Sequence, residues 1–171
     1  MLLATVSLLM LAVAALAGVS GRARVSGRYR LVYVHVAGQA YASGTSTRRW
    51  SAVPSCAEGP CATHVRSIYK DGSVSAVLPF SFDGRTYEWS QHVKGVADCR
   101  KRDGTNDVIA KAYDAAVLSR FRVTQMSASG RALVFKGTFS TRFTPSAAGR
   151  AHHCGYTTST ERFTGYAITA P

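Results

Sequence analysis

The most regular pattern in this chain is an alternation of apolar and polar side chains with a period of two. It is clearest in residues 131–143, where four large apolar side chains share one face and Lys136, Thr138, Ser140 and Arg142 fall opposite. Successive side chains of a β-strand point to opposite faces, so this segment predicts a strand with one buried and one solvated face. The apolar side chains that share its odd-numbered face are Leu133, Phe135, Phe139 and Phe143.

Similar stretches recur about every 10 to 15 residues, and turn-forming residues separate them. Two Asp-Gly pairs, Asp71-Gly72 and Asp83-Gly84, mark residues 62–93 as a meander of three antiparallel strands. Residues 95–105 are polar and charged and predict a loop, as does the stretch that leads to Cys154. The full set of expected strands is 28–37, 45–53, 62–69, 73–80, 85–93, 108–113, 118–126, 131–143 and 156–170, the last with a possible break near Gly165.

Strands joined by hairpin-length connections, with no convincing helix after residue 25, predict an all-β domain. An antiparallel up-and-down β-barrel fits best, because closure removes exposed sheet edges, and a two-sheet β-sandwich is the alternative. We expect one domain over residues 27–171. The expected core side chains are Trp50, Trp89, Phe135, Phe139 and Phe143, whereas an open lumen would be lined by Tyr33, His35 and Tyr87.

Residues 1–17 carry no charged side chain and end in Ala15-Leu16-Ala17, which supplies small residues at a cleavage site. This pattern predicts a secretory signal peptide, with residues 18–26 as a short extension before the domain. Arginines at positions 22, 24, 28 and 30 follow the apolar run, so an uncleaved anchor is the alternative. A helix in the core of the domain is the third interpretation of residues 1–17. The predicted location is secreted or cell-surface.

The chain has 4 cysteines, a number that suits two disulfides in an oxidising compartment. Four cysteines can form two disulfides in three ways. A Gly-Pro turn between Cys56 and Cys61 favours a local bridge, which leaves Cys99 to pair with Cys154. The alternative is a zinc site with the histidines at 152 and 153, but the cysteine spacing lacks the close pairs of structural zinc sites.

Lysine and arginine total 21 against 9 acidic residues, a formal charge of +12. A basic surface attracts anionic polymers and lipid head groups without reading a sequence. For an exported protein, the expected partner is an anionic wall polymer or a membrane surface, with no specific nucleic acid. A solvated surface with no ligand is the alternative. The candidate binding residues are Arg48, Arg49, Arg100, Lys101, Arg102, Arg120 and Arg122.

Catalytic motifs do not stand out in this sequence. There is no G-x-S-x-G, and the three glutamates Glu58, Glu88 and Glu161 form no recognisable pair. We therefore expect a non-enzymatic binding domain with no cofactor and no metal. A protease inhibitor that presents the loop from Cys56 to Cys61 is the alternative. A hydrolase site assembled across strands is a third possibility.

The order of several residues resembles an uncharacterised group of actinobacterial exported domains, found as small secreted proteins or lipoproteins. The resemblance covers about residues 27–166 and centres on a W-x(3)-P-x-C-x(4)-C core. The residues that carry it are Gly27, Tyr29, Trp50, Pro54, Cys56, Pro60, Cys61, Cys99 and Cys154. It implies a β-rich, disulfide-bridged, extracytoplasmic domain and assigns no catalytic or binding residue. The lipidation cysteine of the lipoprotein members is absent from this sequence.

Overall fold

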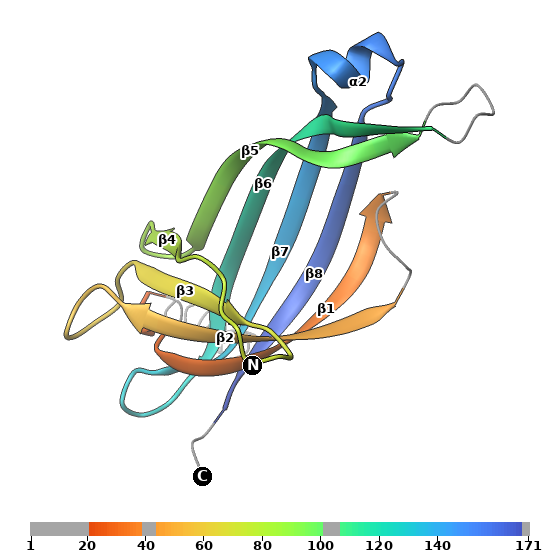
Figure 1. Cartoon of the computed structure of the whole chain (residues 1–171). Helices are drawn as coiled ribbons and strands as arrows, with labels where there is room; N and C mark the ends of the chain where they lie inside the picture. Colours follow the sequence, from red (N-terminus) through yellow and green to blue (C-terminus); the bar gives the residue numbers. More distant parts are fainter. Residues whose placement is uncertain (1–20, 39–43, 101–106, 169–171) are drawn as a thin grey trace, which may run out of the picture.

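The described residues form eight strands, each hydrogen-bonded to the next along the chain (Figure 1). This computed structural model describes residues 21–38, 44–100 and 107–168, so the predicted signal peptide, residues 1–17, lies outside them. The strands are β1 (Gly27–Gly38), β2 (Thr45–Pro54), β3 (Thr63–Ile68), β4 (Leu78–Phe82), β5 (Tyr87–Arg100), β6 (Val108–Met126), β7 (Ala132–Pro145) and β8 (Thr157–Ala167). β8 pairs with β1 and closes the ring, which confirms the up-and-down barrel over the sandwich.

The barrel is a complete ring only at one end, because β3 and β4 are short. β3 pairs with β2 over Arg49–Pro54, and β4 pairs with β5 only through Tyr87 and Glu88. Beyond these pairs, the described parts of β2 and β5 have no strand partner on that side. We call the complete end, where β1 begins, the packed end. The end where β1 finishes and β2 begins is the mouth.

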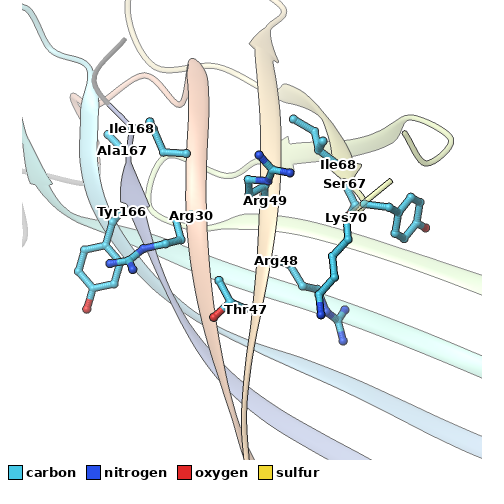
Figure 2. Close-up of a pocket in the computed structure, with 11 residues that line it drawn as sticks. Arg30, Thr47, Arg48, Arg49, Ser67, Ile68, Lys70, Tyr166, Ala167 and Ile168 are labelled. Carbon is cyan, nitrogen blue, oxygen red and sulfur yellow. The ribbon is translucent and has the colours of Figure 1, made fainter. Parts of the chain in front are cut away.

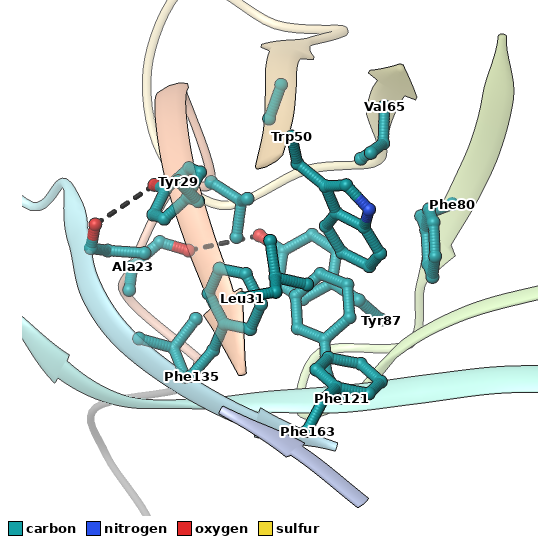
Figure 3. Close-up of a cluster of buried hydrophobic side chains, with 14 of the residues drawn as sticks. Ala23, Tyr29, Leu31, Trp50, Val65, Phe80, Tyr87, Phe121, Phe135 and Phe163 are labelled. Atoms are coloured by element: carbon teal, nitrogen blue, oxygen red, sulfur yellow. Dashed lines mark hydrogen bonds between the residues drawn. The ribbon is translucent and has the colours of Figure 1, made fainter. Parts of the chain in front are cut away.

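Aromatic side chains fill the packed end (Figure 3). The Trp50 ring lies centrally, and its centroid is 5.6–6.2 Å from four phenylalanine rings, those of Phe80, Phe121, Phe135 and Phe163. The core prediction is confirmed for Trp50 and Phe135, which are buried. Trp89 and Phe139 are only partly buried and pack against this cluster. Tyr33 and Tyr87, two of the residues that would line an open lumen, are buried in this cluster.

Residues 21–26, expected as an extension before the domain, pack into the barrel at the packed end. Ala23 and Val25 are fully buried there. The Tyr87 hydroxyl donates to the Ala23 carbonyl at 3.1 Å, and the Thr63 hydroxyl donates to the Val25 carbonyl at 3.1 Å. Burial raises the pKa of Tyr87 to about 12. These bonds satisfy backbone carbonyls that would otherwise be buried without partners.

Two glycines make room for the rings of the packed end. Gly165 pairs across the sheet with Phe135, and Gly137 pairs with Phe163. A Cβ on Gly165 would lie 2.2 Å from the Phe135 ring. Each phenylalanine ring therefore covers the glycine on the neighbouring strand, which explains why β8 runs unbroken through Gly165 where a break was predicted.

β5 and β6 are longer than predicted, and the expected loop over residues 95–105 is wrong for its first part. Residues 95–100 continue β5, and β6 is one strand where two were expected. Two aspartates stabilise the bulges in this pairing: Asp114 accepts from the Gly95 amide at 3.0 Å, and Asp98 accepts from the Lys111 amide at 2.9 Å. Side-chain acceptors can compensate for interrupted ladder bonds, so polar, glycine-containing sequence can remain in a strand.

A five-residue helix, α2 (Ala147–Ala151), lies in the stretch predicted as a loop. Ser146 caps it by accepting from the Gly149 amide at 3.2 Å. The Cys99–Cys154 disulfide links the end of β5 to the segment after α2, and Cys56–Cys61 closes a small loop between β2 and β3, as predicted. With all four cysteines paired, no thiolate is left for the zinc alternative. Among the described residues, no helix is long and apolar enough to cross a membrane.

Candidate functional site

A groove of about 780 Å³ lies on the outside of the barrel (Figure 2). It crosses the outer faces of β1 and β2 and reaches the ends of β3 and β8. We call it the outer groove. Its lining is Arg30, Thr47, Arg48, Arg49, Ser67, Ile68, Tyr69, Lys70, Tyr166, Ala167 and Ile168.

Strand register places the charges of the outer groove side by side. Arg30 is directly opposite Arg49 on β2 and directly opposite Tyr166 on β8. The Arg30 guanidinium carbon lies 5.8 Å from the centroid of the Tyr166 ring. Lys70 follows β3 in the turn, and none of the lining residues is acidic. Like charges opposite each other destabilise a sheet, so this arrangement favours a bound anion.

Four of the eight described carboxylates serve backbone turns and bulges and do not neutralise these cations. Asp83 accepts from the amides of Thr86 at 2.7 Å and Arg85 at 2.8 Å, and these bonds lower its pKa. Asp71 accepts from both the amide and the hydroxyl of Ser73. Asp98 and Asp114 hold the bulges described above. The positive charge of the outer groove is therefore left without a local acidic partner among its lining residues.

The adjacent arginines Arg48 and Arg49, predicted as one binding group, have different surroundings. Arg49 lies in the outer groove. Arg48 also borders that groove, but its guanidinium carbon lies 4.4 Å from the centroid of the Tyr33 ring, inside the barrel. Its Nη2 is 3.6 Å from Oε2 of Glu161. Side chains of neighbouring strand residues point to opposite faces, which explains the divergence.

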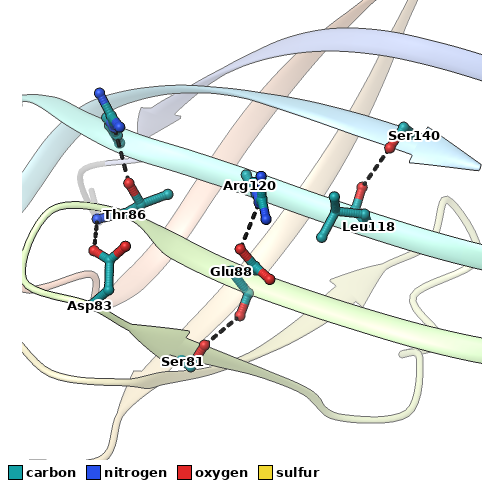
Figure 4. A network of polar contacts seen from close by, with 8 residues as sticks. Ser81, Asp83, Thr86, Glu88, Leu118, Arg120 and Ser140 are labelled. Carbon is teal, nitrogen blue, oxygen red and sulfur yellow. Dashed lines mark hydrogen bonds and ion pairs between the residues drawn. The ribbon is translucent and has the colours of Figure 1, made fainter.

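The other predicted basic residues do not gather at this groove. Arg120 and Arg122 lie on the outer face of β6, where Arg120 pairs with Glu88 at 2.6 Å and Arg122 donates to the Thr86 hydroxyl at 3.0 Å (Figure 4 shows this face). Arg100 is the last residue of β5 and is not among the residues that line the groove. Lys101 and Arg102 lie outside the described residues.

A second hollow, of about 410 Å³, opens at the mouth of the barrel. We call it the mouth cavity, and its lining is His35, Gly44, Thr45, Ser46, Arg48, Phe139, Thr141, Phe143, Ser159 and Glu161. Phe143 was predicted to be core, but it borders this cavity because β7 extends beyond the filled part of the barrel. Of the three residues that would line an open lumen, His35 lines this cavity.

Alternating polar and aromatic side chains form one row across the inner wall at the level of this cavity. In the strand register, Trp89, Ser119, Phe139, Glu161 and His35 follow one another on β5, β6, β7, β8 and β1. We call this set the inner row. Glu161 is 19% exposed in its side chain, so its carboxylate is partly shielded from water. Below the row, burial raises the pKa of the Tyr33 phenol.

The described residues contain no group of three or more His, Cys, Asp or Glu side chains that could hold a metal ion. Comparisons with known protein families, with curated proteins and with solved structures found no match.

Sequence reasoning missed Arg30, Lys70 and Glu161. Arg30 and Lys70 are 40 positions apart by number and meet only through the register of three strands. A signal for Glu161 does exist in the sequence. It occupies the same alternating face as Phe163, so a carboxylate stands where the pattern expects an apolar residue.

Proposed function

We propose that this protein is an exported, non-enzymatic binding domain that holds an anionic, phosphate-bearing polymer of the cell envelope in its outer groove. The observation that carries this proposal is a concave surface with no acidic residue in its lining, around which lie Arg30, Arg49 and Lys70, three of its four basic residues. Phosphate groups on a polymer would relieve the repulsion between the opposed arginines.

A polymer fits the groove better than a flat membrane surface does. Tyr166, Arg30, Arg49 and Ile68 form a row that crosses β8, β1, β2 and β3 in register. A row of this kind offers a linear path for a polymer chain. All four residues line the outer groove, which is concave, whereas a membrane surface is flat. Displacement of counterions from the polymer would supply much of the affinity, which should therefore fall steeply with salt.

Export is part of the same proposal. Two disulfides are typical of proteins that fold in oxidising compartments, and the apolar residues 1–17 have the pattern of a secretory signal peptide. An extracytoplasmic protein meets wall polymers and lipids, and not chromosomal nucleic acid. For this reason we propose an anion of the cell envelope, and not a nucleic acid, as the ligand of the outer groove.

The test is a salt titration of binding to inorganic polyphosphate. We expect the triple variant Arg30→Ser/Arg49→Ser/Lys70→Ser to bind at least about tenfold more weakly and to lower the salt slope by about 2 to 3. The matched control is Arg122→Ser/Lys136→Ser/Arg142→Ser, which removes the same charge from the outer faces of β6 and β7. The control should weaken binding by less than about threefold, because long-range attraction is screened at physiological salt.

Equal weakening by the two triple variants would mean that only the overall charge attracts the polymer, and the outer groove would then have no special role. Tighter binding to phosphatidylglycerol vesicles than to polyphosphate would replace the polymer by a membrane surface. Either result overturns the proposal as stated.

A further inference from the structure

We propose that the mouth cavity is a second binding site, which takes a neutral sugar unit the size of a mono- or disaccharide. This inference does not depend on the outer groove. It concerns the interior of the barrel, where the charge, the aromatic surface and the free hydrogen-bonding capacity differ from those outside. A cavity of about 410 Å³ lies within the range of small-molecule sites.

The paired charges of the cavity select a neutral ligand. Arg48 and Glu161 lie 3.6 Å apart at its wall, so an anion attracted by the guanidinium would be repelled by the carboxylate, and a cation would meet the reverse. A hydroxyl group is both a donor and an acceptor. Two neighbouring hydroxyls can therefore donate to Glu161 and accept from Arg48 without disturbing the charge balance.

The aromatic side chains offer a surface for the carbon face of a sugar ring. Phe139 and Phe143 border the cavity, and Phe139 stands next to Glu161 in the inner row. The Arg48 guanidinium carbon is 4.4 Å from the Tyr33 ring centroid and 5.9 Å from that of Phe139. Stacking against these rings orients the guanidinium and limits its motion, so its donors are held in place before a ligand arrives.

Unpartnered hydroxyls on the inner wall point to the same class of ligand. The buried Oγ of Ser119 and Oγ1 of Thr157 have no hydrogen-bond partner among the described residues. Ser119 is opposite Phe139 and Thr157 is opposite Phe143, so each pairs in register with an aromatic side chain of the cavity. Buried hydroxyls without partners are unusual in folded proteins. Neither residue belongs to the cavity lining, so these hydroxyls add polar capacity to the wall beside Phe139 and Phe143 and do not contact the ligand themselves.

Three more polar side chains and an exposed rim complete the site. Ser46, Thr141 and Ser159 supply hydroxyls to the lining. Gly44, Thr45 and Ser46, at the start of β2, are exposed to solvent and form part of the lining. Aromatic side chains with several convergent polar groups around a concave surface are the usual form of a small-ligand site.

The experiment is an NMR titration of the ¹⁵N-labelled full-length chain with the methyl glycosides of glucose, galactose and mannose, and with N-acetylglucosamine and maltose. Sodium acetate and methyl phosphate are the charged comparisons. Concentrations up to about 50 mM cover dissociation constants in the millimolar range. We expect at least one sugar to shift the amides of Thr141, Ser159 and Glu161, and both anions to bind more weakly than that sugar.

Two single variants make the test specific, because the described residues include an ion pair inside the barrel and another outside it. Glu161→Ala removes the inner carboxylate, whereas Glu88→Ala removes the outer one, which pairs with Arg120. We expect Glu161→Ala to weaken sugar binding about tenfold or more, the effect of losing one hydrogen bond to a charged group. The same variant should bind acetate more tightly than the wild type, because Arg48 is then unpaired. Glu88→Ala should change neither affinity.

Three results would overturn the proposal: no sugar shifts the cavity amides, an anion binds the wild type more tightly than every sugar, or the two variants have equal effects. If Glu161→Ala fails to fold, Phe139→Leu replaces it. That variant should also weaken the sugar at least about threefold while leaving acetate binding unchanged, as expected for the loss of an aromatic contact. Unchanged sugar binding in Phe139→Leu would contradict the site.

Discussion

The two ends of the barrel are built from the same strands but differ in what their inward-facing positions carry. Along β8, Phe163 and Gly165 face the packed end, and Ser159 and Glu161 face the mouth. The alternation of inward and outward side chains does not change between the two ends. What changes is the chemistry of the inward residues, and this turns a filled core into a polar cavity within a few residues.

The two ends also differ in how they are stabilised. The packed end depends on mutual contacts among aromatic rings and on a plug formed by residues 21–26. The mouth end of the sheet, where little apolar surface is buried, has the Cys99–Cys154 disulfide and the capped helix α2. A covalent link compensates where packing cannot hold long strands together.

The largest expected effect comes from removing the central ring of the packed end. Trp50→Ala should lower the free energy of unfolding by about 3 to 5 kcal/mol, because it removes buried aromatic surface and leaves a cavity. Phe143→Ala, at the mouth, should cost less than about 1.5 kcal/mol. Urea denaturation measures both. Equal losses would contradict the division into a packed and an open end.

The disulfides should follow in size. Replacing Cys99 and Cys154 with serine should cost about 4 kcal/mol, since the bridge closes a loop with a sequence separation of 55. Replacing Cys56 and Cys61 should cost about 2 kcal/mol, for a separation of 5. The test is the order of the two urea midpoints. A larger loss of stability from removing the short bridge than from removing the long one would contradict the role given to the long bridge at the mouth.

Adding a methyl group at a glycine should lower the stability of the protein at the packed end and leave it unchanged near the mouth. Gly165→Ala should destabilise the protein by about 1 to 3 kcal/mol, because the new Cβ would lie 2.2 Å from the Phe135 ring. Gly155→Ala is the control, since no heavy atom lies within 4 Å of a Cβ there. Thermal denaturation of both variants gives the comparison, and an unchanged melting temperature for Gly165→Ala would show that the Phe135 ring can move away.

The smallest effect is a pH dependence specific to the packed end. Burial raises the pKa of Tyr87 to about 12, from 10.0 for a free phenol. The folded state therefore keeps its proton where the unfolded state loses it. The stability from this group is complete below pH 10 and declines as the pH rises toward 12. The urea midpoint should fall over that interval, and it should fall less in Tyr87→Phe. An identical decline in this variant would exclude Tyr87 as a cause.

The barrel could be predicted because it depends on local signals, and the disulfides could be predicted because the turn between Cys56 and Cys61 favours a local bridge and leaves Cys99 to pair with Cys154. Alternation in residues 131–143 and the two Asp-Gly turns are visible without knowledge of the fold. The continuity of β5 was not visible, because it depends on Asp98 and Asp114 bonding to amides of the neighbouring strand. The groove was missed for the same reason. Arg30, Arg49 and Lys70 meet through strand register, which no short window of sequence records.

The most direct test of the proposed function is to map where polyphosphate binds, using the backbone amide shifts of the ¹⁵N-labelled protein. We predict shifts concentrated at Arg30, Arg49 and Lys70, with the inner row unchanged. Shifts spread equally over Arg122 and Lys136, on the outer faces of β6 and β7, would show that charge alone attracts the polymer and would contradict a built site in the outer groove.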